Sequence, residues 1–283
     1  MHRAAPAILV AIGLLANTLA CAASDATRPL DFSVVNQRSV TLTAQAWNPN
    51  LAYVSRKAKV LLRLRMGKTA PETTDMTVKE GIAFAYTNHL FTPERDKLGY
   101  RAIARLGGPP IHGAIVVRDD SPVRSLDQLR DKTVVFPSPN AFVAYQIPAD
   151  HLRELGINVV ETFAGNQEGA IAQFKAGQVA AAGVNKKSLE QYAARSDFPY
   201  RVLWVSAPHL EHPIMAHPAL PPDVVAAVRK AFVDMDHDVE GRKVLQTSAA
   251  VLHLKEPWSF VAVEDRDYDV YRHFYKRRAA QAQ

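Results

Sequence analysis

The sequence predicts an α/β protein built from mostly parallel sheets that helices flank. Short apolar runs of strand length alternate with stretches of helical period along almost the whole chain, the pattern of strand–helix–strand units. The loops that follow these strands are rich in Ser, Thr, Asn and Gln. Of the 283 residues, 48% are hydrophobic and 22% are charged, which is typical of a globular protein. The chain is long enough for two modest domains.

Residues 1–23 have the layout of a secretory signal peptide. A short basic start precedes an uncharged, mainly aliphatic run that ends on small residues. Its most hydrophobic part, residues 7–15, is shorter than the roughly 20 residues that a membrane-spanning helix needs. Two routes of processing stay open: cleavage that releases a soluble protein, and lipidation of Cys21, because Leu19-Ala20-Cys21 resembles a lipoprotein box. Both routes predict an exported protein.

The charge of the chain is mildly basic. The formal net charge is +6, and removal of residues 1–23, which contain one charged residue, Arg3, leaves +5. The basic residues are dispersed, and their densest run, Lys276–Arg278, is typical of a solvated terminus, so we expect no nucleic-acid partner. Cys21 is the only cysteine, so no intramolecular disulfide can form. We expect a monomer that meets the membrane only if Cys21 is lipidated.

The first series of elements comprises four strands and two helices. Ser39 can cap the first helix, Val40–Val54. Pro49 should kink this helix or divide it into two pieces, because proline lacks the amide hydrogen that an interior turn needs. A shorter helix ends near Gly81. The predicted strands are Leu30–Val35, Val60–Leu64, Ile82–Tyr86 and Arg101–Leu106.

A second series of elements begins at Ile111. Its longest helix runs from close to Val143 to Leu155, because Pro148 fits only in the first turn of a helix. The predicted strands are Ile115–Val117, Thr133–Phe136, Val159–Phe163, Val179–Val184 and Arg201–Val205. The other helices are a small one that Ser125 can cap, Glu168–Ala176 and Lys187–Ala194.

The last third of the chain returns to the pattern of the first series. A short strand, Ile214–His217, precedes a helix that Pro221 and Asp223 open. Two more helical stretches, Glu240–Thr247 and Asp265–Lys276, follow. No internal repeat or low-complexity linker separates the series.

The polar loops after the strands predict an anion-binding site. Open parallel sheets bind ligands at the carboxyl ends of their strands, and a helix that begins there directs free amides and its positive end at the ligand. Any single one of these side chains could instead cap a helix. The loop residues are Gln37, Arg38, Ser39, Lys68, Thr69, Tyr86, Thr87, Asn88, Ser138, Asn140, Asn166 and Gln167.

Sequence signatures of catalysis are absent from the chain. It has no Gly-x-Ser-x-Gly elbow, no Walker loop, no dinucleotide-binding glycine pattern and no His-Glu-x-x-His. His209, His212 and His217 lie near Glu211, but their spacing matches no common zinc site and the prolines among them indicate an extended crossover. We therefore predict no enzyme, no catalytic residue, no cofactor and no metal.

A series of motifs, in one order along nearly the whole mature chain, resembles the phosphate, phosphite and phosphonate substrate-binding proteins of ABC importers. The motifs include Asn36-Gln37-Arg38-Ser39, Tyr86-Thr87-Asn88-His89, Phe136-Pro137-Ser138-Pro139-Asn140, Phe163-Ala164-Gly165-Asn166-Gln167-Glu168 and Ala181-Ala182-Gly183-Val184-Asn185. The resemblance implies a type II periplasmic-binding fold, with two α/β lobes that close on a ligand between them. Lobe 1 would comprise residues 24–112 and 213–283, and lobe 2 residues 113–212.

The resemblance also implies pocket positions, and the chain departs from the family at three of them. Tyr86 matches a family tyrosine. Ala141-Phe142-Val143 stand where many relatives have hydroxyl residues, Gln167 stands in place of a histidine, and Asn185 in place of an aspartate. The predicted ligand-binding residues are Gln37, Arg38, Ser39, Lys68, Thr69, Tyr86, Thr87, Asn88, Ser138, Asn140, Ala141, Phe142, Gln167, Glu168 and Asn185.

The function that this resemblance implies is capture of a small oxyanion in the periplasm for an ABC importer. The oxyanion would be of the phosphate, phosphite or phosphonate type, and the partners would be the permease subunits. An alternative with the same fold is a periplasmic sensor subunit that reports its ligand to a signalling system. The sequence leaves open which anion is bound.

Overall fold

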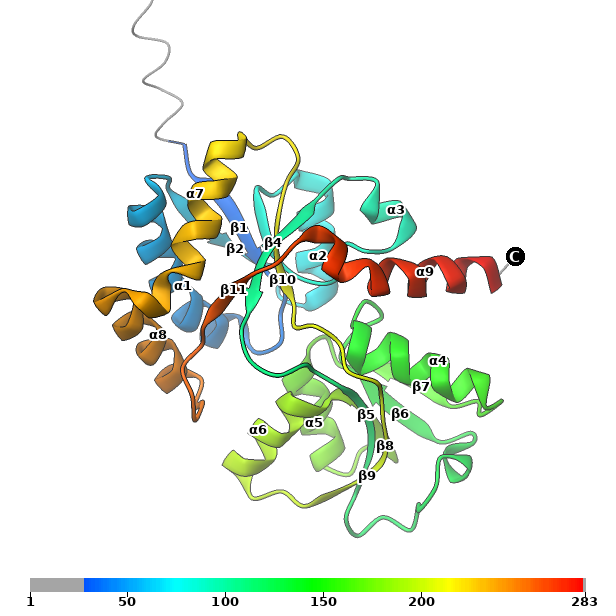
Figure 1. Ribbon diagram of the computed structural model, residues 1–283. Coiled ribbons are helices and arrows are strands. Elements are labelled where there is room, and N and C mark those ends of the chain that lie inside the picture. Colours follow the sequence, from blue (N-terminus) through cyan, green and yellow to red (C-terminus); the bar gives the residue numbers. More distant parts are fainter. Residues whose placement is uncertain (1–27, 282–283) are drawn as a thin grey trace, which may run out of the picture.

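The computed structural model describes residues 28–281, which form two α/β lobes (Figure 1). The predicted signal peptide and Cys21 lie outside the described residues. Within residues 28–281, no helix is both long enough and apolar enough to cross a membrane. The predicted α/β architecture is confirmed, with one sheet in each lobe and helices against both sheets.

The first lobe is built on a six-stranded sheet with the strand order β11-β4-β10-β3-β1-β2. Its strands are β1 (Leu30–Val34), β2 (Leu62–Arg65), β3 (Phe84–Tyr86), β4 (Arg101–Leu106), β10 (Pro213–Ala216) and β11 (Phe260–Ala262). Its helices are α1 (Val40–Ala58), α2 (Ala70–Glu80), α3 (Pro93–Asp96), α7 (Pro222–Val233), α8 (Val239–Val251) and α9 (Asp269–Gln281).

The second lobe is built on a five-stranded sheet with the strand order β7-β6-β8-β5-β9. Its strands are β5 (Gly113–Arg118), β6 (Thr133–Phe136), β7 (Val160–Phe163), β8 (Ala181–Asn185) and β9 (Tyr200–Val205). Its helices are α4 (Ile147–Glu154), α5 (Gln167–Lys175) and α6 (Lys186–Ser196), with a 3-10 turn at Asp127–Leu129.

The two sheets are mixed, and the places where the chain crosses between lobes explain why. Pairs such as β1–β3 and β6–β8 are parallel, as expected. By contrast, β11 runs antiparallel to β4, and β5 and β10 run antiparallel to both of their neighbours. The crossings between lobes account for β5 and β10. Each of these two strands enters its sheet from the other lobe, and therefore starts at the edge where the parallel strands end. The two crossings pair with each other through Ile111 and His209, whose amides donate to each other's carbonyls at 2.8 Å.

Local structure departs from the sequence predictions within α1 and in the turn before α4. α1 is one helix that continues through Pro49, rather than two pieces. Before α4 the chain forms a single π-helical turn, Phe142–Gln146, in which the Ala141 carbonyl accepts from the amides of both Tyr145 and Gln146 at 2.9 Å. The predicted helix from Val143 therefore becomes a π turn followed by α4, with Pro148 in the first turn of α4 as expected.

Helix α9 leaves the first lobe and lies against the second (Figure 1). The Phe142 ring centroid is 4.0 Å from that of Tyr271 on α9, and Phe142 also contacts the rings of Phe274 and Tyr275. We call this contact, together with the ion pairs at its end, the α9 clasp.

The ion pairs of the clasp join the end of α9 to α4. The Arg277 guanidinium lies 2.8 Å from the buried Asp150 carboxylate and 3.3 Å from Glu154, and Arg278 also pairs with Asp150. The expected solvated terminus thus holds for Lys276 and Arg277, which are exposed even though Arg277 also pairs with Asp150, whereas Arg278 is half-buried.

Candidate anion-binding cleft

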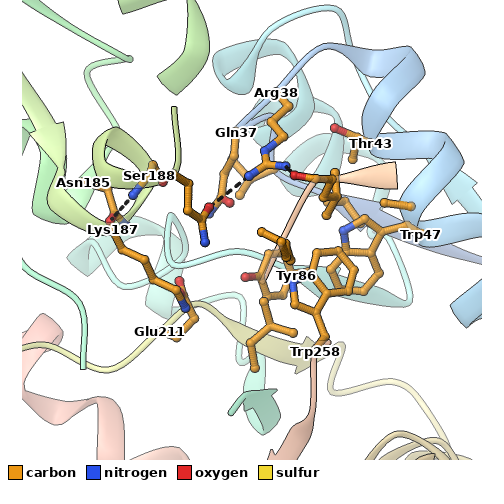
Figure 2. Close-up of a pocket in the computed structure, with 17 residues that line it drawn as sticks. Gln37, Arg38, Thr43, Trp47, Tyr86, Asn185, Lys187, Ser188, Glu211 and Trp258 are labelled. Carbon is orange, nitrogen blue, oxygen red and sulfur yellow. Dashed lines mark hydrogen bonds and ion pairs between the residues drawn. The ribbon is translucent and has the colours of Figure 1, made fainter. Parts of the chain in front are cut away.

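Two adjoining cavities lie between the lobes and share Val35, Gln37, Asn185 and Ser188. The inner cavity offers about 40 Å³ to the centres of water molecules. One buried water needs roughly 10–15 Å³ on this measure, so the inner cavity has room for a group of a few heavy atoms. Its polar lining is Asn36, Gln37, Asn88, His89, Ser138, Gln167, Asn185, Ser188 and His212. The outer cavity is lined among others by Arg38, Thr43, Trp47, Tyr86, Lys187, Gln191, Glu211 and Trp258 (Figure 2).

Three buried side chains of the cleft carry polar atoms that have no hydrogen-bond partner in residues 28–281. They are the Tyr86 hydroxyl, both amide atoms of Asn88, and Nε2 of Gln167, on side chains that are 2%, 1% and 6% exposed. Asn88 lies near the Tyr271 hydroxyl, which donates to the Leu210 carbonyl at 2.7 Å and so can act towards Asn88 only as an acceptor. Leaving a buried polar atom unpaired costs about 1–3 kcal/mol, so this cluster favours a polar ligand in the cleft.

The side chains of Gln167 and Asn185 both direct amide donors into the cleft. Oε1 of Gln167 accepts from the backbone N–H of Asn185 at 3.1 Å, which leaves Nε2 of Gln167 as the free end of that side chain. Oδ1 of Asn185 accepts from the Ser188 amide at 3.3 Å and caps α6, which leaves its NH₂ group free. Because the oxygen of each amide is already used, each residue offers N–H donors to an occupant.

Arg38 reaches across the mouth of the cleft in the outer cavity (Figure 2). Its guanidinium donates to the Leu252 carbonyl at 3.3 Å and to Oε1 of Gln191 on the opposite lobe at 3.1 Å. Nε lies 3.9 Å from the Glu168 carboxylate. Burial lowers the pKa of Arg38, although Glu168 opposes that effect. An arginine stays charged even so, and Arg38 therefore brings a partly desolvated cation to the cleft.

An aromatic wall faces the same cavity. The ring centroids of Trp47 and Tyr86 are 4.8 Å apart, and those of Trp47 and Trp258 are 5.4 Å apart. Burial raises the pKa of Tyr86 well above its ordinary value of 10, so its hydroxyl remains a neutral donor. Figure 2 shows these rings together on one side of the cleft.

Glu211 is the ionised carboxylate of the outer cavity. Burial by itself would raise its pKa, but hydrogen bonds from His212 and the charges of His212 and Lys187 lower the pKa to about 2. Oε1 lies 2.8 Å from Nδ1 of His212, and Oε2 lies 3.7 Å from Nζ of Lys187. Lys187 belongs to the second lobe, so this pair also spans the cleft.

Nine of the fifteen predicted ligand-binding residues line the two cavities: Gln37, Arg38, Tyr86, Asn88, Ser138, Ala141, Phe142, Gln167 and Asn185. The other six lie outside both cavities, and their part in ligand binding stays a prediction. Lys68 is exposed, whereas Ser39 and Thr69 cap α1 and α2. The Thr87 hydroxyl accepts from the His89 amide at 3.0 Å. Asn140 and Glu168 accept from arginines, Arg95 at 2.9 Å and Arg195 at 3.1 Å respectively.

Sequence reasoning missed several residues that line the cleft: Trp47, His89, Lys187, Ser188, Gln191, Glu211, His212 and Trp258. His89 could have been found, because it directly follows three predicted site residues in the loop after β3. The others come from helices and a crossover far apart in the sequence, and only the folded chain brings them together.

Comparisons with known proteins agree with this architecture. The chain matches the model of a family described as ABC transporter, phosphonate, periplasmic substrate-binding protein over residues 32–268. No curated protein matches the chain in sequence.

Several solved structures share the fold. A binding-protein component of an ABC phosphonate transporter from Pseudomonas aeruginosa superposes with a TM-score of 0.74 at 17% identity, over 90% of this chain and 89% of that chain. PhnD1 from Prochlorococcus marinus in complex with methylphosphonate gives a TM-score of 0.72 at 13% identity, over 88% and 97%. The aliphatic sulphonate binding protein SsuA from Escherichia coli gives 0.58 at 13% identity, over 90% and 87%.

Proposed function

Because the chain belongs to the family of periplasmic substrate-binding proteins of phosphonate ABC transporters, we propose that its cleft captures a small oxyanion of the phosphate, phosphite or phosphonate type for an ABC importer. The observation that carries the proposal is the set of unpartnered buried polar atoms on Tyr86, Asn88 and Gln167. Asn88 belongs to the first lobe and Gln167 to the second, and both line the inner cavity, so one ligand bound to both would hold the lobes together.

The chemistry of the cleft suits an anion of this kind. A buried oxyanion is costly to desolvate unless donors or positive charge meet it. Gln167 and Asn185 supply amide donors, Tyr86 supplies a hydroxyl that stays protonated, and Arg38 supplies the nearby cation. The inner cavity is lined by no Asp or Glu that would repel the anion.

Calorimetric titration of the purified mature chain tests the proposal. The anions are phosphate, phosphite, methylphosphonate, methanesulfonate and sulfate. Gln167→Glu replaces a free donor by a carboxylate, and hydrogen bonds to charged groups contribute about 1.5–3 kcal/mol, so affinity for the bound anion should fall at least about tenfold. Gln178→Glu, an exposed change just beyond α5 with the same alteration of charge, should leave affinity unchanged. Failure of every anion to bind the wild-type chain would show the proposal to be wrong.

The importer part of the proposal has its own measurement. Deletion of the gene in the native host should abolish uptake of the anion that binds. Unchanged uptake, with loss of a transcriptional response to that anion, would instead favour the sensor subunit.

A further inference from the structure

His89 lies in the inner cavity next to the unpartnered amide of Asn88, and is 3% exposed. Its Nδ1 is 2.7 Å from the hydroxyl of Thr74 on α2. That hydroxyl donates to the Ala70 carbonyl at 2.9 Å. A hydroxyl has one hydrogen, so with this hydrogen on Ala70 the Thr74 oxygen can only accept from His89. With the Thr74 hydrogen assigned to Ala70, the neutral imidazole carries its proton on Nδ1 and keeps a lone pair on Nε2, which is the tautomer that the inference below uses.

The surroundings of His89 keep the ring neutral. Burial lowers the pKa of His89 well below its ordinary value of 6.5, and the charges of His212 and Arg95 lower it further. Arg95, on α3, donates to the His89 carbonyl at 3.0 Å, and His212 precedes β10. These are the charged or titratable groups that act on the ring, and both oppose a positive charge on it. In the described part of the chain Nε2 makes no hydrogen bond. Nε2 is thus an unused acceptor.

The hydroxyls of Ser138 and Ser188 in the inner cavity can donate as well as accept, whereas Nε2 of this tautomer can only accept. Gln167 and Asn185 turn donors towards the inner cavity, and the ionised carboxylate of the outer cavity, Glu211, is already engaged by His212 and Lys187. Asn88 has a free oxygen, but its amide can rotate to offer either end. Nε2 of His89 has no such freedom, because Thr74 holds the ring.

We propose that Nε2 of His89 accepts a hydrogen bond from the ligand's own acidic proton, so that the inner cavity selects a monoprotonated phosphonate or phosphate over a sulfonate or sulfate. This selection rests on the proposed function and narrows its ligand class. A phosphate-type group keeps one proton below its second pKa, which is about 6 for a phosphate ester. A sulfonate carries no proton at these pH values, so its oxygen would meet the Nε2 lone pair without a hydrogen between them. His89 thereby replaces the carboxylate that would otherwise recognise a protonated oxyanion.

The test compares methylphosphonate with methanesulfonate, which have the same shape and, at pH 5.5, the same single charge. Calorimetry of the wild-type chain at pH 5.5 should give at least a tenfold preference for methylphosphonate. That preference should shrink as the pH rises past the second ionisation of the phosphonate, while affinity for methanesulfonate stays flat. His89→Phe should weaken methylphosphonate at least tenfold and change methanesulfonate less than twofold.

Thr74→Val tests the positioning of the ring, since it keeps the side-chain shape and removes the acceptor for Nδ1. It should reduce the preference between the two anions without abolishing binding of either. Thr77→Val removes a similar buried hydroxyl from the same helix, away from His89, and should leave the preference intact.

Failures of the inference and of the proposed function give different results. If none of the five anions of the calorimetric screen binds, both fall. If the two anions bind equally well, or if His89→Phe weakens both alike, the proposed function stands and the selection by His89 is wrong. Nitrogen-15 chemical shifts of the ligand-free protein provide a test that needs no ligand: they should show a neutral ring with its proton on Nδ1 at pH 6. A proton on Nε2, or a charged ring, overturns the inference.

Discussion

Asn185 shows how one side chain can stabilise a helix and orient a binding group at the same time. From the sequence, each loop amide seemed either to cap a helix or to bind the ligand. In the structure Asn185 caps α6 through its oxygen, and this bond determines that its NH₂ group is the end left for the cleft. Gln167 is fixed in the same way by the Asn185 amide. In both residues a backbone N–H already occupies the side-chain oxygen, by helix capping in Asn185, and this is the reason they present donors rather than acceptors.

The titration of Glu211 predicts an acid-sensitive part of the stability. Its pKa falls from 4.5 to about 2 on folding, so the carboxylate stabilises the folded state above pH 4.5, and this stabilisation is lost as pH falls from 4.5 towards 2. One pKa unit corresponds to 1.36 kcal/mol, which makes the contribution at most about 3 kcal/mol. Glu211→Gln should lower the free energy of unfolding at neutral pH and flatten its fall over this window.

The matched control for this prediction is Glu190→Gln. Glu190 forms an exposed pair with Lys186 one helical turn away, which contributes only about 0.3–0.5 kcal/mol. Denaturant unfolding from pH 2 to 7 measures all three proteins. If the free energy of unfolding of Glu211→Gln falls as steeply between pH 4.5 and pH 2 as that of the wild type, the pairing with His212 does not stabilise the fold.

At the scale of elements, the sequence predicted most strands and helices because their periodicity is local. The spans of β4 and β6 match the predictions, and the Gly81 stop and Ser39 cap are where expected. The three residues of β11 and the four of α3 were not predicted, because elements this short leave no periodic signal. The sequence also did not predict the antiparallel direction of β5 and β10, because that direction follows from the crossing of the chain between lobes.

The candidate site was less predictable than the fold for a related reason. The loop residues Gln37, Asn88 and Gln167 could be found because each follows or begins a predicted element. Glu211, Lys187 and their neighbours meet only through the packing of one lobe on the other, which no local pattern contains.

The contact of α1 with α8 explains why Pro49 does not break α1. Asn50 is the next residue. Its side-chain NH₂ group donates to the Ala46 carbonyl at 2.6 Å and to the Ser248 hydroxyl on α8 at 2.7 Å. Ser248 donates to the same Ala46 carbonyl at 2.8 Å. This buried hydrogen-bond network holds the helical turn around the proline. The packing of α1 on α8 therefore outweighs the low helix propensity of the local sequence.

Loss of the Ser248 hydroxyl should therefore destabilise the first lobe. Ser248→Ala removes one partner of a buried amide and carbonyl, and should lower the free energy of unfolding by about 1–3 kcal/mol. The neighbouring Thr247→Ala removes an exposed hydroxyl that bonds only within α8, and should change it by less than about 0.5 kcal/mol. Urea unfolding compares the two variants. Equal changes in the free energy of unfolding would mean that this hydrogen-bond network does not hold α1 together.

At the scale of the whole molecule, the α9 clasp keeps the lobes in contact from the side opposite to Arg38. Arg277→Glu with Arg278→Glu should repel Asp150 and Glu154, release α9 from α4 and open the cleft. We expect a larger radius of gyration in the ligand-free protein by small-angle X-ray scattering, and weaker anion binding, because part of the binding free energy must then close the lobes.

Lys255→Glu with Lys276→Glu is the matched control for the clasp. Both lysines are exposed, and the pair changes the net charge by the same amount. It should leave the radius of gyration and the affinity unchanged. A double arginine variant as compact as this control would show that the clasp does not hold the lobes closed.

Because of the α9 clasp, contact between the two lobes does not depend on whether the cleft holds a ligand. The aromatic contacts and ion pairs of the clasp join the lobes through protein atoms alone. A closed arrangement of the lobes therefore does not by itself show that a ligand is bound. A bound ligand would instead contact Tyr86, Asn88 and Gln167, whose buried polar atoms have no hydrogen-bond partner within residues 28–281.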